Sequence, residues 1–343
     1  MKRTLFLTTF FFTMIGVFSA AAVEIPAAKL RAFKPLPSSM ESATNPSSLA
    51  KIDLGRMLYY DHRLSKSQKF SCNSCHMLDK YGVDNEATSE GHKGQRGDRN
   101  SPTVYNAAGH MAQFWDGRAK DVEAQAKGPI LNPVEMAMPD EKSVIVVLKS
   151  MPEYVALFAK AFPGTKDAVT YDNMANAIGA FERGLLTPSR WDKFLAGDQK
   201  ALTDVEKAGF LKFTEAGCAA CHSGVLLGGS MYQKLGVVKP FPDAKDIGRA
   251  KVTKSEAEKF YFKVPSLRNV EKTGPYLHNG QTKTLAEAIS AMGDYQLGMK
   301  LTAAEVGSIG AWLKSLTGQV PLNYIAKPKL PASTASTPRA SAD

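Results

Sequence analysis

Two strings of the pattern Cys-x-x-Cys-His contain all four cysteines of this 343-residue chain. The first string comprises Cys72, Cys75 and His76, and the second comprises Cys218, Cys221 and His222. In this pattern the two thiols add to the vinyl groups of a haem, and the adjacent histidine supplies an axial nitrogen to the iron. A disulfide framework or a zinc site would leave the repeated histidine unexplained. The sequence therefore predicts two covalently attached haem c groups, with His76 and His222 as the proximal iron ligands.

The N-terminal segment has the three parts of an export signal. Lys2 and Arg3 precede an uncharged run at residues 5–18, and small residues at 19–22 provide a cleavage site. We expect a signal peptide at residues 1–22, a mature chain that begins near Val23, and a periplasmic location. The alternative is an uncleaved membrane anchor, because residues 4–22 are just long enough to span a bilayer.

The formal net charge of +10 describes a moderately basic protein. Such a surface could steer an acidic partner protein, although the same excess of charge could serve only solubility. We expect no nucleic-acid binding, because no compact basic run is interleaved with aromatic residues and the chain is exported.

One part of the chain recurs 163 residues later (265 minus 102): residues 102–106 and Gly117 match residues 265–269 and Gly280. A repeat in constant register indicates that a single haem domain was duplicated. We therefore expect an N-terminal haem domain, a C-terminal haem domain and a disordered tail rich in Ala, Ser, Thr and Pro, at residues 23–167, 168–325 and 326–343 respectively.

Apolar residues at three- and four-residue spacing predict a mainly α fold with little β, made of two cytochrome c-like domains. The expected helices cover residues 143–158, 171–185, 203–216 and 302–316. Thr203 and Thr302 begin capping boxes at the last two of these helices. Long loops at 77–101 and 224–264 are expected to wrap around the haems.

Four further strings occur in order along the chain: Gly-His-x-x-Gln at 91–95, Phe-Trp-Asp-Gly-Arg at 114–118, Asn-Pro-Val-Glu-Met at 132–136, and Met-Gly-x-x-Gln-Leu-Gly at 292–298. With the two haem strings, they make residues 45–320 resemble the dihaem bacterial cytochrome c peroxidase family, which is related to the quinone-maturation dihaem oxidases. The resemblance implies that the second haem is a high-potential site of electron entry and the first a low-potential peroxidatic site.

The same resemblance implies that the two irons differ in their sixth ligand. Met292 matches the family's axial methionine at the second haem, and a thioether ligand raises the reduction potential. Its counterpart in the repeat is Pro129, which cannot bind iron, so the first haem is left open at that position. His92 lies in a glycine-containing loop and matches the family's displaceable distal histidine at the first iron. Release of His92 after reduction of the second haem would open the first iron to peroxide.

Three residues match family positions that act at or between the haems. Glu135 matches the catalytic acid and base, which takes a proton from one peroxide oxygen and returns it to the other. Gln125 matches a polar residue of the distal side. Trp115, the repeat counterpart of His278, matches the tryptophan between the haems, where it could relay an electron or only fill the interface.

Calcium is implied by the resemblance alone, as an ion that bridges the two domains. The side chain of Asn100 and the backbone carbonyls of Thr273 and Pro275 match its protein ligands, and oxygen ligands suit calcium. The family is commonly dimeric, so a homodimer is expected.

The leading hypothesis is a peroxidase that reduces hydrogen peroxide to water with electrons from a small cytochrome c or a copper protein (a cupredoxin). A second hypothesis is an oxidase that matures a tryptophan-derived quinone on another protein. Such relatives carry tyrosine in place of the axial methionine, which Met292 opposes, although Tyr295 is three residues away. A third is a dihaem electron carrier without enzymatic activity, in which His92 is a permanent ligand and Glu135 has no task.

Overall fold

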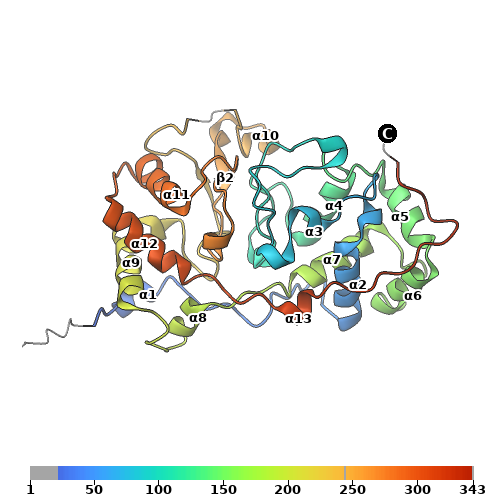
Figure 1. Cartoon of the computed structure of the whole chain (residues 1–343), viewed down its shortest axis with the longest axis horizontal. Coiled ribbons are helices and arrows are strands. Elements are labelled where there is room, and N and C mark those ends of the chain that lie inside the picture. The colour runs from blue at the N-terminus through green and yellow to red at the C-terminus, as the bar shows by residue number, and fades with distance from the viewer. Residues whose placement is uncertain (1–21, 243–244, 342–343) are drawn as a thin grey trace, which may run out of the picture.

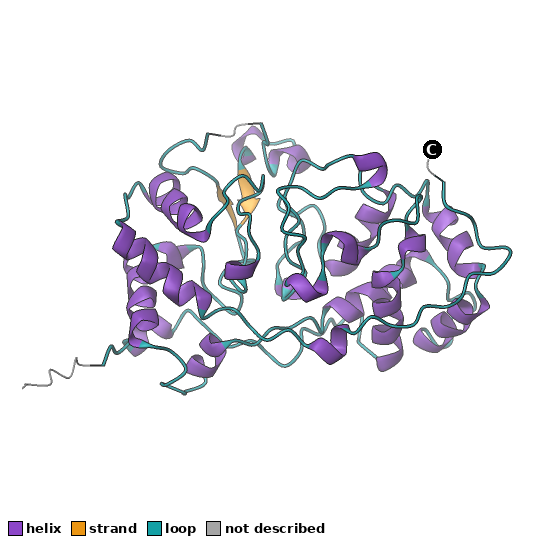
Figure 2. Ribbon diagram, in the orientation of Figure 1, coloured by secondary structure: helices purple, strands orange, loops and turns teal. Residues whose placement is uncertain are grey.

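Helices joined by long loops build almost the whole chain, which forms two lobes side by side (Figures 1 and 2). The computed structural model describes residues 22–242 and 245–341, so the predicted signal peptide lies, except for Ala22, outside the described residues. Within the described part, the single sheet has two strands, β1 (Tyr232–Lys234) and β2 (Tyr261–Lys263), which pair antiparallel. The prediction of a mainly α fold with little β is confirmed. In that same part of the chain no helix has the length and apolar character that crossing a membrane requires.

The first lobe, on the right in Figure 1, contains α2 (Leu49–Tyr60), α3 (Cys72–Cys75), α4 (Val122–Leu131), α5 (Glu141–Lys149), α6 (Pro152–Ala161) and α7 (Tyr171–Glu182). Leu54 and Leu58 of α2 are fully buried against α7. The two helices approach closely at Gly55, because a Cβ atom there would lie 1.9 Å from the carbonyl oxygen of Ala177. Cys72 of the first haem-binding string packs against the core that these two helices form.

The second lobe is built on α9 (Asp204–Glu215) and α12 (Ala303–Lys314), and it also holds α1 (Ala27–Leu30), α8 (Arg190–Leu195), α10 (Ala250–Thr253) and α11 (Leu285–Ala291). Its core is aromatic: Trp191 and Trp312 are fully buried with ring centroids 5.4 Å apart, and Phe210 packs against both. The predicted capping boxes at Thr203 and Thr302 are present. The side chains that these helices bury define a core separate from that of the first lobe.

The chain passes between the lobes three times, so neither lobe is one continuous segment. Phe33, near the described N-terminus, packs on Trp191 and Phe210 of the second core, whereas α7 packs in the first core. The predicted boundary between residues 167 and 168 stays a prediction, but the packing groups α7 with the helices that precede it.

The disordered tail at residues 326–343 stays a prediction, but the described part of this segment contacts the first lobe. After α13 (Leu322–Ile325), residues 326–341 run in extended form along the first lobe (Figure 1). Arg63 Nη1 donates to the carbonyl oxygen of Pro331 at 2.8 Å, and Gln68 Nε2 donates to that of Pro338 at 2.9 Å. The tail has too few apolar residues to form a helix with a buried face or a packed core. Its backbone carbonyls can still accept hydrogen bonds from side chains of the first lobe, which hold it in an extended form.

One difference from the sequence-based expectation concerns the helix at residues 143–158, which is divided into α5 and α6. Pro152 has no N–H to continue the first helix and takes the first position of the second, where none is needed. The apolar spacing across the break is preserved, so spacing alone could not reveal it.

Backbone geometry repeats at the interval found in the sequence. Asn106 and Asn269 both have left-handed φ values, 61° and 60°, and both donate Nδ2 to Thr187 Oγ1 at 2.8 Å. Isolated bridges recur at the same interval, at Gln113–Ala119 and Tyr276–Thr282. The two copies therefore meet at Thr187, which is fully buried between the lobes.

Candidate active site

A cavity of about 430 Å³ in the first lobe brings together most of the residues predicted for the first haem site. Its lining includes Cys72, Cys75, His76, Asn100, Trp115, Gln125, Pro129 and Glu135. These residues come from α3, from α4, from the segment between them and from the turn after α4, so the fold gathers positions spread over more than sixty residues of sequence. The volume is in the range of cofactor and ligand sites.

The residues of the first string fit a covalently bound haem. α3 is a single turn with a capping box between Ser71 and Ser74, and the backbone N–H of His76 donates to the carbonyl oxygen of Cys72 at 3.0 Å. Burial lowers the pKa of His76, so its ring is neutral, as an iron ligand must be. The string therefore presents two thiols and a neutral imidazole at one cavity.

The second string fits the same chemistry in the second lobe. His222 Nδ1 lies 3.1 Å from the carbonyl oxygen of Leu227, which fixes the ring and leaves Nε2 for a metal. Burial lowers the pKa of His222 as well. Cys218 and Cys221 are partly buried free cysteines at the end of α9.

Glu135 forms the acidic part of the first cavity's wall. The turn that carries it is closed by Asn132, whose Oδ1 accepts from the N–H of Val134 at 3.0 Å and whose Nδ2 donates to Glu135 Oε1 at 2.8 Å. Burial raises the pKa of the Glu135 carboxyl, while the charge of Arg118 and the Asn132 hydrogen bond oppose this rise. The site thus holds a carboxyl whose proton affinity is increased, which is the property that a general acid and base requires near neutral pH.

Arg118 and Phe114 are cavity residues that the sequence reasoning missed. The Arg118 guanidinium lies 3.4 Å from the centroid of the Phe114 ring and donates to Asp116 Oδ1 at 3.1 Å. Both line the cavity. Both belong to the string Phe-Trp-Asp-Gly-Arg, in which the family resemblance implies a role for the tryptophan alone. The structure therefore adds a cation and an aromatic ring to the surroundings of Glu135.

His92 lies beside this cavity but is not among the residues that line it. Its side chain is only 4% exposed, and its backbone N–H donates to the carbonyl oxygen of Glu135 at 2.9 Å. Gly91 lines the cavity in its place, and a Cβ atom there would lie 2.1 Å from the carbonyl oxygen of Val134. The His92 loop is thus packed directly on the Glu135 turn, while ligation of iron by His92 stays a prediction.

Met292 begins a five-residue π-helical turn, Met292–Gln296, that continues α11. Such turns are rare and are frequent at functional sites. The turn is held by the loop after β1: Gln296 Nε2 donates to the carbonyl oxygen of Lys234 at 3.0 Å, and Lys239 pairs with Asp294. Ligation of the second iron by Met292 stays a prediction, and Pro129, its repeat counterpart, lies in the wall of the first cavity.

Trp115 lies where the two lobes meet. Its Nε1 donates to the carbonyl oxygen of Asn100 at 2.9 Å, and its own carbonyl oxygen accepts from the N–H of Lys263 in β2 at 2.7 Å. Its ring is 6.5 Å from that of His278, its repeat counterpart. The predicted position between the two haem units is consistent with these contacts.

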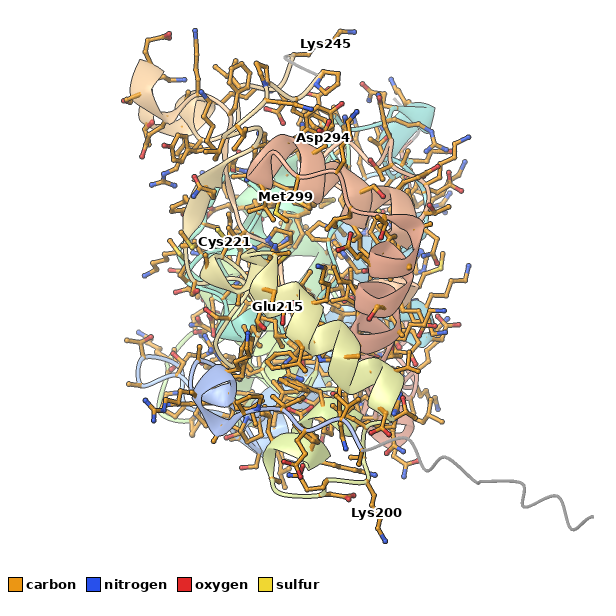
Figure 3. All side chains as sticks on the ribbon, turned by 90° about the vertical axis from the view of Figure 1, so that its left-hand side faces the viewer. Lys200, Glu215, Cys221, Lys245, Asp294 and Met299 are labelled. Atoms are coloured by element: carbon orange, nitrogen blue, oxygen red, sulfur yellow. The ribbon has the colours of Figure 1, made fainter. Side chains whose placement is uncertain are left out.

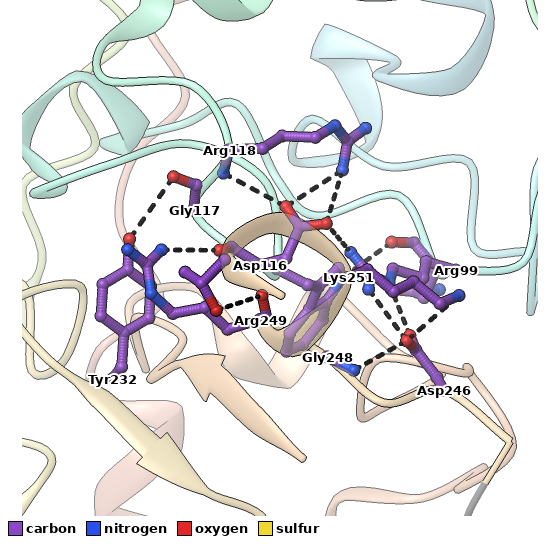
Figure 4. A network of polar contacts seen from close by, with 12 residues as sticks. Arg99, Asp116, Gly117, Arg118, Tyr232, Asp246, Gly248, Arg249 and Lys251 are labelled. Atoms are coloured by element: carbon purple, nitrogen blue, oxygen red, sulfur yellow. Dashed lines mark hydrogen bonds and ion pairs between the residues drawn. The ribbon is translucent and has the colours of Figure 1, made fainter. Parts of the chain in front are cut away.

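Charged side chains beside Trp115 join the lobes further (Figure 4). Arg99 of the first lobe pairs with Asp116 at 2.6 Å and, in a two-pronged contact, with Asp246 of the second lobe at 2.6 and 2.9 Å. Arg249 completes the network by donating to the carbonyl oxygen of Asp116 at 3.0 Å. Because Arg99 and Asp116 line the first cavity, the second lobe helps to fix that wall.

The segments predicted to bind calcium also come together at the lobe interface. The backbone N–H of Asn100 donates to the carbonyl oxygen of His278 at 2.7 Å, and Asn85 Nδ2 donates to that of Gly274 at 2.8 Å. Asn100 Nδ2 donates to the carbonyl oxygen of Glu86 at 2.8 Å, so the oxygen end of this amide is the end left for a cation. Over residues 22–242 and 245–341 no group of three or more His, Cys, Asp or Glu side chains could hold a metal ion. A calcium site here would therefore rest on amide and carbonyl oxygens.

Comparison with known proteins supports the family resemblance. A family described as di-haem cytochrome c peroxidase matches residues 49–200. The chain is 48% identical over 314 residues to a cytochrome c551 peroxidase of Pseudomonas aeruginosa, with 90% of each chain covered. It is 45% identical over 340 residues to a cytochrome c551 peroxidase of Nitrosomonas europaea, with 98% of each covered. The crystal structure of a MauG-like protein associated with microbial copper homeostasis superposes with a TM-score of 0.76 at 26% identity, covering 90% of this chain and 99% of that one.

The fold and the two haem-binding strings define a dihaem c-type oxidoreductase. The chain belongs to the di-haem cytochrome c peroxidase family. It is accordingly an enzyme, a peroxidase, and the cofactors of its family are two haem c groups.

Proposed function

We propose that the protein reduces hydrogen peroxide to water at the first haem, with electrons that arrive one at a time at the second haem from a small periplasmic cytochrome c or cupredoxin. One observation carries the proposal. A single cavity contains both the first haem-binding string and Glu135, a partly buried carboxyl whose pKa is raised. Two haems suit the stoichiometry, because one electron can wait at the second while the first reacts.

When bound, the first haem supplies the iron that holds peroxide and delivers electrons to it. Glu135 accepts a proton from one peroxide oxygen and returns it to the other as the bond between them breaks. Asn132 holds Glu135 Oε1 at 2.8 Å, so Oε2 is the oxygen left for this proton. Gln125, on the α4 side of the cavity, would orient the peroxide by hydrogen bonding.

The test is the turnover of Glu135→Gln with a reduced small cytochrome c as donor. Glutamine keeps the size of the side chain but cannot carry the proton, so we expect kcat to fall by a factor of about 10² or more. Glu90→Gln is the matched control, because Glu90 also borders the cavity but is exposed. Full turnover by Glu135→Gln would rule out the assigned role.

We also propose that His92 occupies the first iron in the resting protein and leaves when the second haem is reduced. The backbone hydrogen bond from His92 to Glu135 supports this, because displacement of the His92 loop would also displace the Glu135 turn. Lys93 and Gly94 have left-handed φ values of 60° and 72°, which places a tight bend next to the histidine. The half-reduced His92→Gly variant should give the same high-spin spectrum as its oxidised form, whereas the wild type should change.

Electron entry at the second lobe is supported by the end face of that lobe, which Figure 3 shows with Met299 labelled on it. Val237, Val238 and Met299 are 52%, 55% and 40% exposed, and Val238 N–H donates to the carbonyl oxygen of Tyr295 in the π-helical turn at 3.1 Å. Apolar side chains exposed together are typical of an interaction site. Val238→Asp should raise KM for the donor protein without slowing the reaction of pre-reduced enzyme with peroxide, and Val205→Asp on α9 is the control.

Two alternatives remain distinguishable by experiment. Met292 in place of tyrosine opposes the quinone-maturing oxidase, and the raised pKa of Glu135, a partly buried carboxyl in the cavity wall, opposes a simple electron carrier. Peroxide-dependent oxidation of a reduced small cytochrome c by wild-type protein, with no need for a protein bearing a quinone precursor, would exclude both.

The remaining features of the proposal are a periplasmic location, a homodimer, a calcium ion held by Asn100, Thr273 and Pro275, and origin of the two haem units by duplication. The shared geometry of Asn106 and Asn269 supports duplication. The contacts of Asn85 and Asn100 across the lobe interface support the calcium site.

A further inference from the structure

Glu182 is a buried carboxyl in the wall of the first cavity, and the proposed reaction of Glu135 with peroxide does not use it. It is the last residue of α7 and is 4% exposed. It shares the cavity lining with Cys72 and with Gln125. Within the described residues, its carboxyl forms no hydrogen bond and no ion pair, although a buried carboxylate would require one.

The nearest cation does not serve Glu182, because its donors are already committed. Arg183 donates Nε and Nη2 to the two oxygens of Glu123 at 3.0 and 2.8 Å, and Nη1 to the carbonyl oxygen of Met40 at 3.0 Å. Asn45 Nδ2 donates to Glu123 at 2.9 Å as well. Glu123 is therefore a fully paired carboxylate, and its negative charge acts on the neighbouring Glu182.

These surroundings keep Glu182 protonated. Burial and then the charge of Glu123 raise its pKa to about 8, and only Arg183 opposes the rise. The other titratable side chain whose charge interacts with Glu182 is Tyr59 of α2, which is fully buried. Cys72 of α3 also lies close to Glu182, but its thiol is taken up by the thioether bond to haem. At neutral pH the cavity thus contains two carboxyls with different tasks: Glu135, held by Asn132, and Glu182, held by no partner.

The chemistry of the reaction leaves a need for such a group. Each turnover consumes one hydrogen peroxide, two electrons and two protons and yields two waters. Glu135 only moves a proton from one oxygen to the other, so it adds none. Both consumed protons must come from elsewhere and must reach the first cavity.

We propose that Glu182 is the proton reservoir of the first cavity, and that it supplies one of the two protons that convert the second peroxide oxygen into water. The O–H bond of the Glu182 carboxyl breaks, the carboxylate is left behind, and it takes up a proton from solvent before the next turnover. The electrons come from the donor protein of the proposed function, on which this inference rests. An ion pair would stabilise the charged form of Glu182 and keep it deprotonated. Because Glu182 has no such partner among the described residues, it can hold the proton that it supplies.

The test combines infrared spectra and kinetics on the protein with both haems attached. Wild type should lose the C=O band of a protonated carboxyl with a midpoint near pH 8. The band should be missing in Glu182→Gln and retained in Glu90→Gln. The kcat of Glu182→Gln should fall at least about tenfold, and its pH profile should lose the decline that wild type shows above pH 8.

Two results would overturn the inference: the band persists in Glu182→Gln, or that variant keeps the kcat and pH profile of wild type. If Glu182→Gln does not fold, Glu182→Asp retains the acid and must retain the band at a shifted midpoint. Failure of the wild type to reduce peroxide would refute the proposed function, whereas normal turnover by Glu182→Gln would refute only the reservoir.

Discussion

The ion pair between Arg268 and Asp192 is buried in the second lobe, and a single substitution can test its contribution to stability. Arg268 Nη1 and Nη2 donate to the two oxygens of Asp192, each at 2.9 Å, and Nε donates to the carbonyl oxygen of Val225 at 2.7 Å. The Arg268 side chain is 0% exposed and that of Asp192 is 10% exposed. Solvent cannot replace either partner, so the loss of one leaves the other charge buried.

Arg268→Met keeps most of the side-chain volume but leaves Asp192 with only the hydrogen bonds from Leu36 N–H and from Ser189. Removal of one partner of a buried pair costs about 3–5 kcal/mol of unfolding free energy. An exposed pair behaves differently: Lys149→Met, which breaks the contact with Asp167 at 60% exposure, should cost less than about 1 kcal/mol.

The assay is urea unfolding of the protein with both haems, followed by tryptophan fluorescence. Trp191 and Trp312 are both in the second core and so report on the lobe that the substitution affects. Asp192→Asn added to Arg268→Met should recover part of the loss, because the stranded charge is removed with its partner. A cost below about 1 kcal/mol for Arg268→Met would refute the argument from burial.

Four further outcomes are expected. Glu182 binds its proton more tightly in the folded state, so its contribution is complete below the unfolded pKa and is lost as pH rises towards about 8. Burial lowers the pKa of Lys263 to about 8, so its contribution is lost as pH falls towards that value. Urea midpoints measured across the pH range should therefore pass through a minimum near pH 8. Met292→Leu should lower the reduction potential of the second haem, as a spectroelectrochemical titration would show. Asn100→Ala should abolish any gain in turnover that added calcium gives to chelator-treated wild type. Truncation after Ile325 should destabilise the first lobe by about 1–2 kcal/mol in urea unfolding, because the hydrogen bonds to the tail are lost.

The haem-binding strings and the helices were predictable because each depends on residues close in sequence. The pattern formed by Cys72, Cys75 and His76 spans five residues and is enough to identify a site of haem attachment. The capping boxes of α9 and α12 each span four residues. The repeat could also be recognised, since a constant interval between matching residues can be read from the sequence without knowledge of the fold.

Features that depend on distant neighbours were not predictable. Asp246 is 147 residues from Arg99, its partner in the network that joins the lobes, and no pattern in either segment points to the other. Glu182 resembles any charged residue at the end of a helix until the cavity beside it is known. The tail at 326–341 has a composition typical of disorder, but the first lobe offers Arg63 and Gln68 as donors to its carbonyls.

The passage of the chain between the lobes has a consequence for the order in which the protein can mature. Phe33 is synthesised early, but its partners Trp191 and Phe210 follow roughly 160 residues and more later along the chain. The first haem-binding string, by contrast, is complete at His76. Haem can therefore be attached to the emerging chain before the second core is able to close, and Phe33 has no core to pack against until Trp191 and Phe210 have followed it.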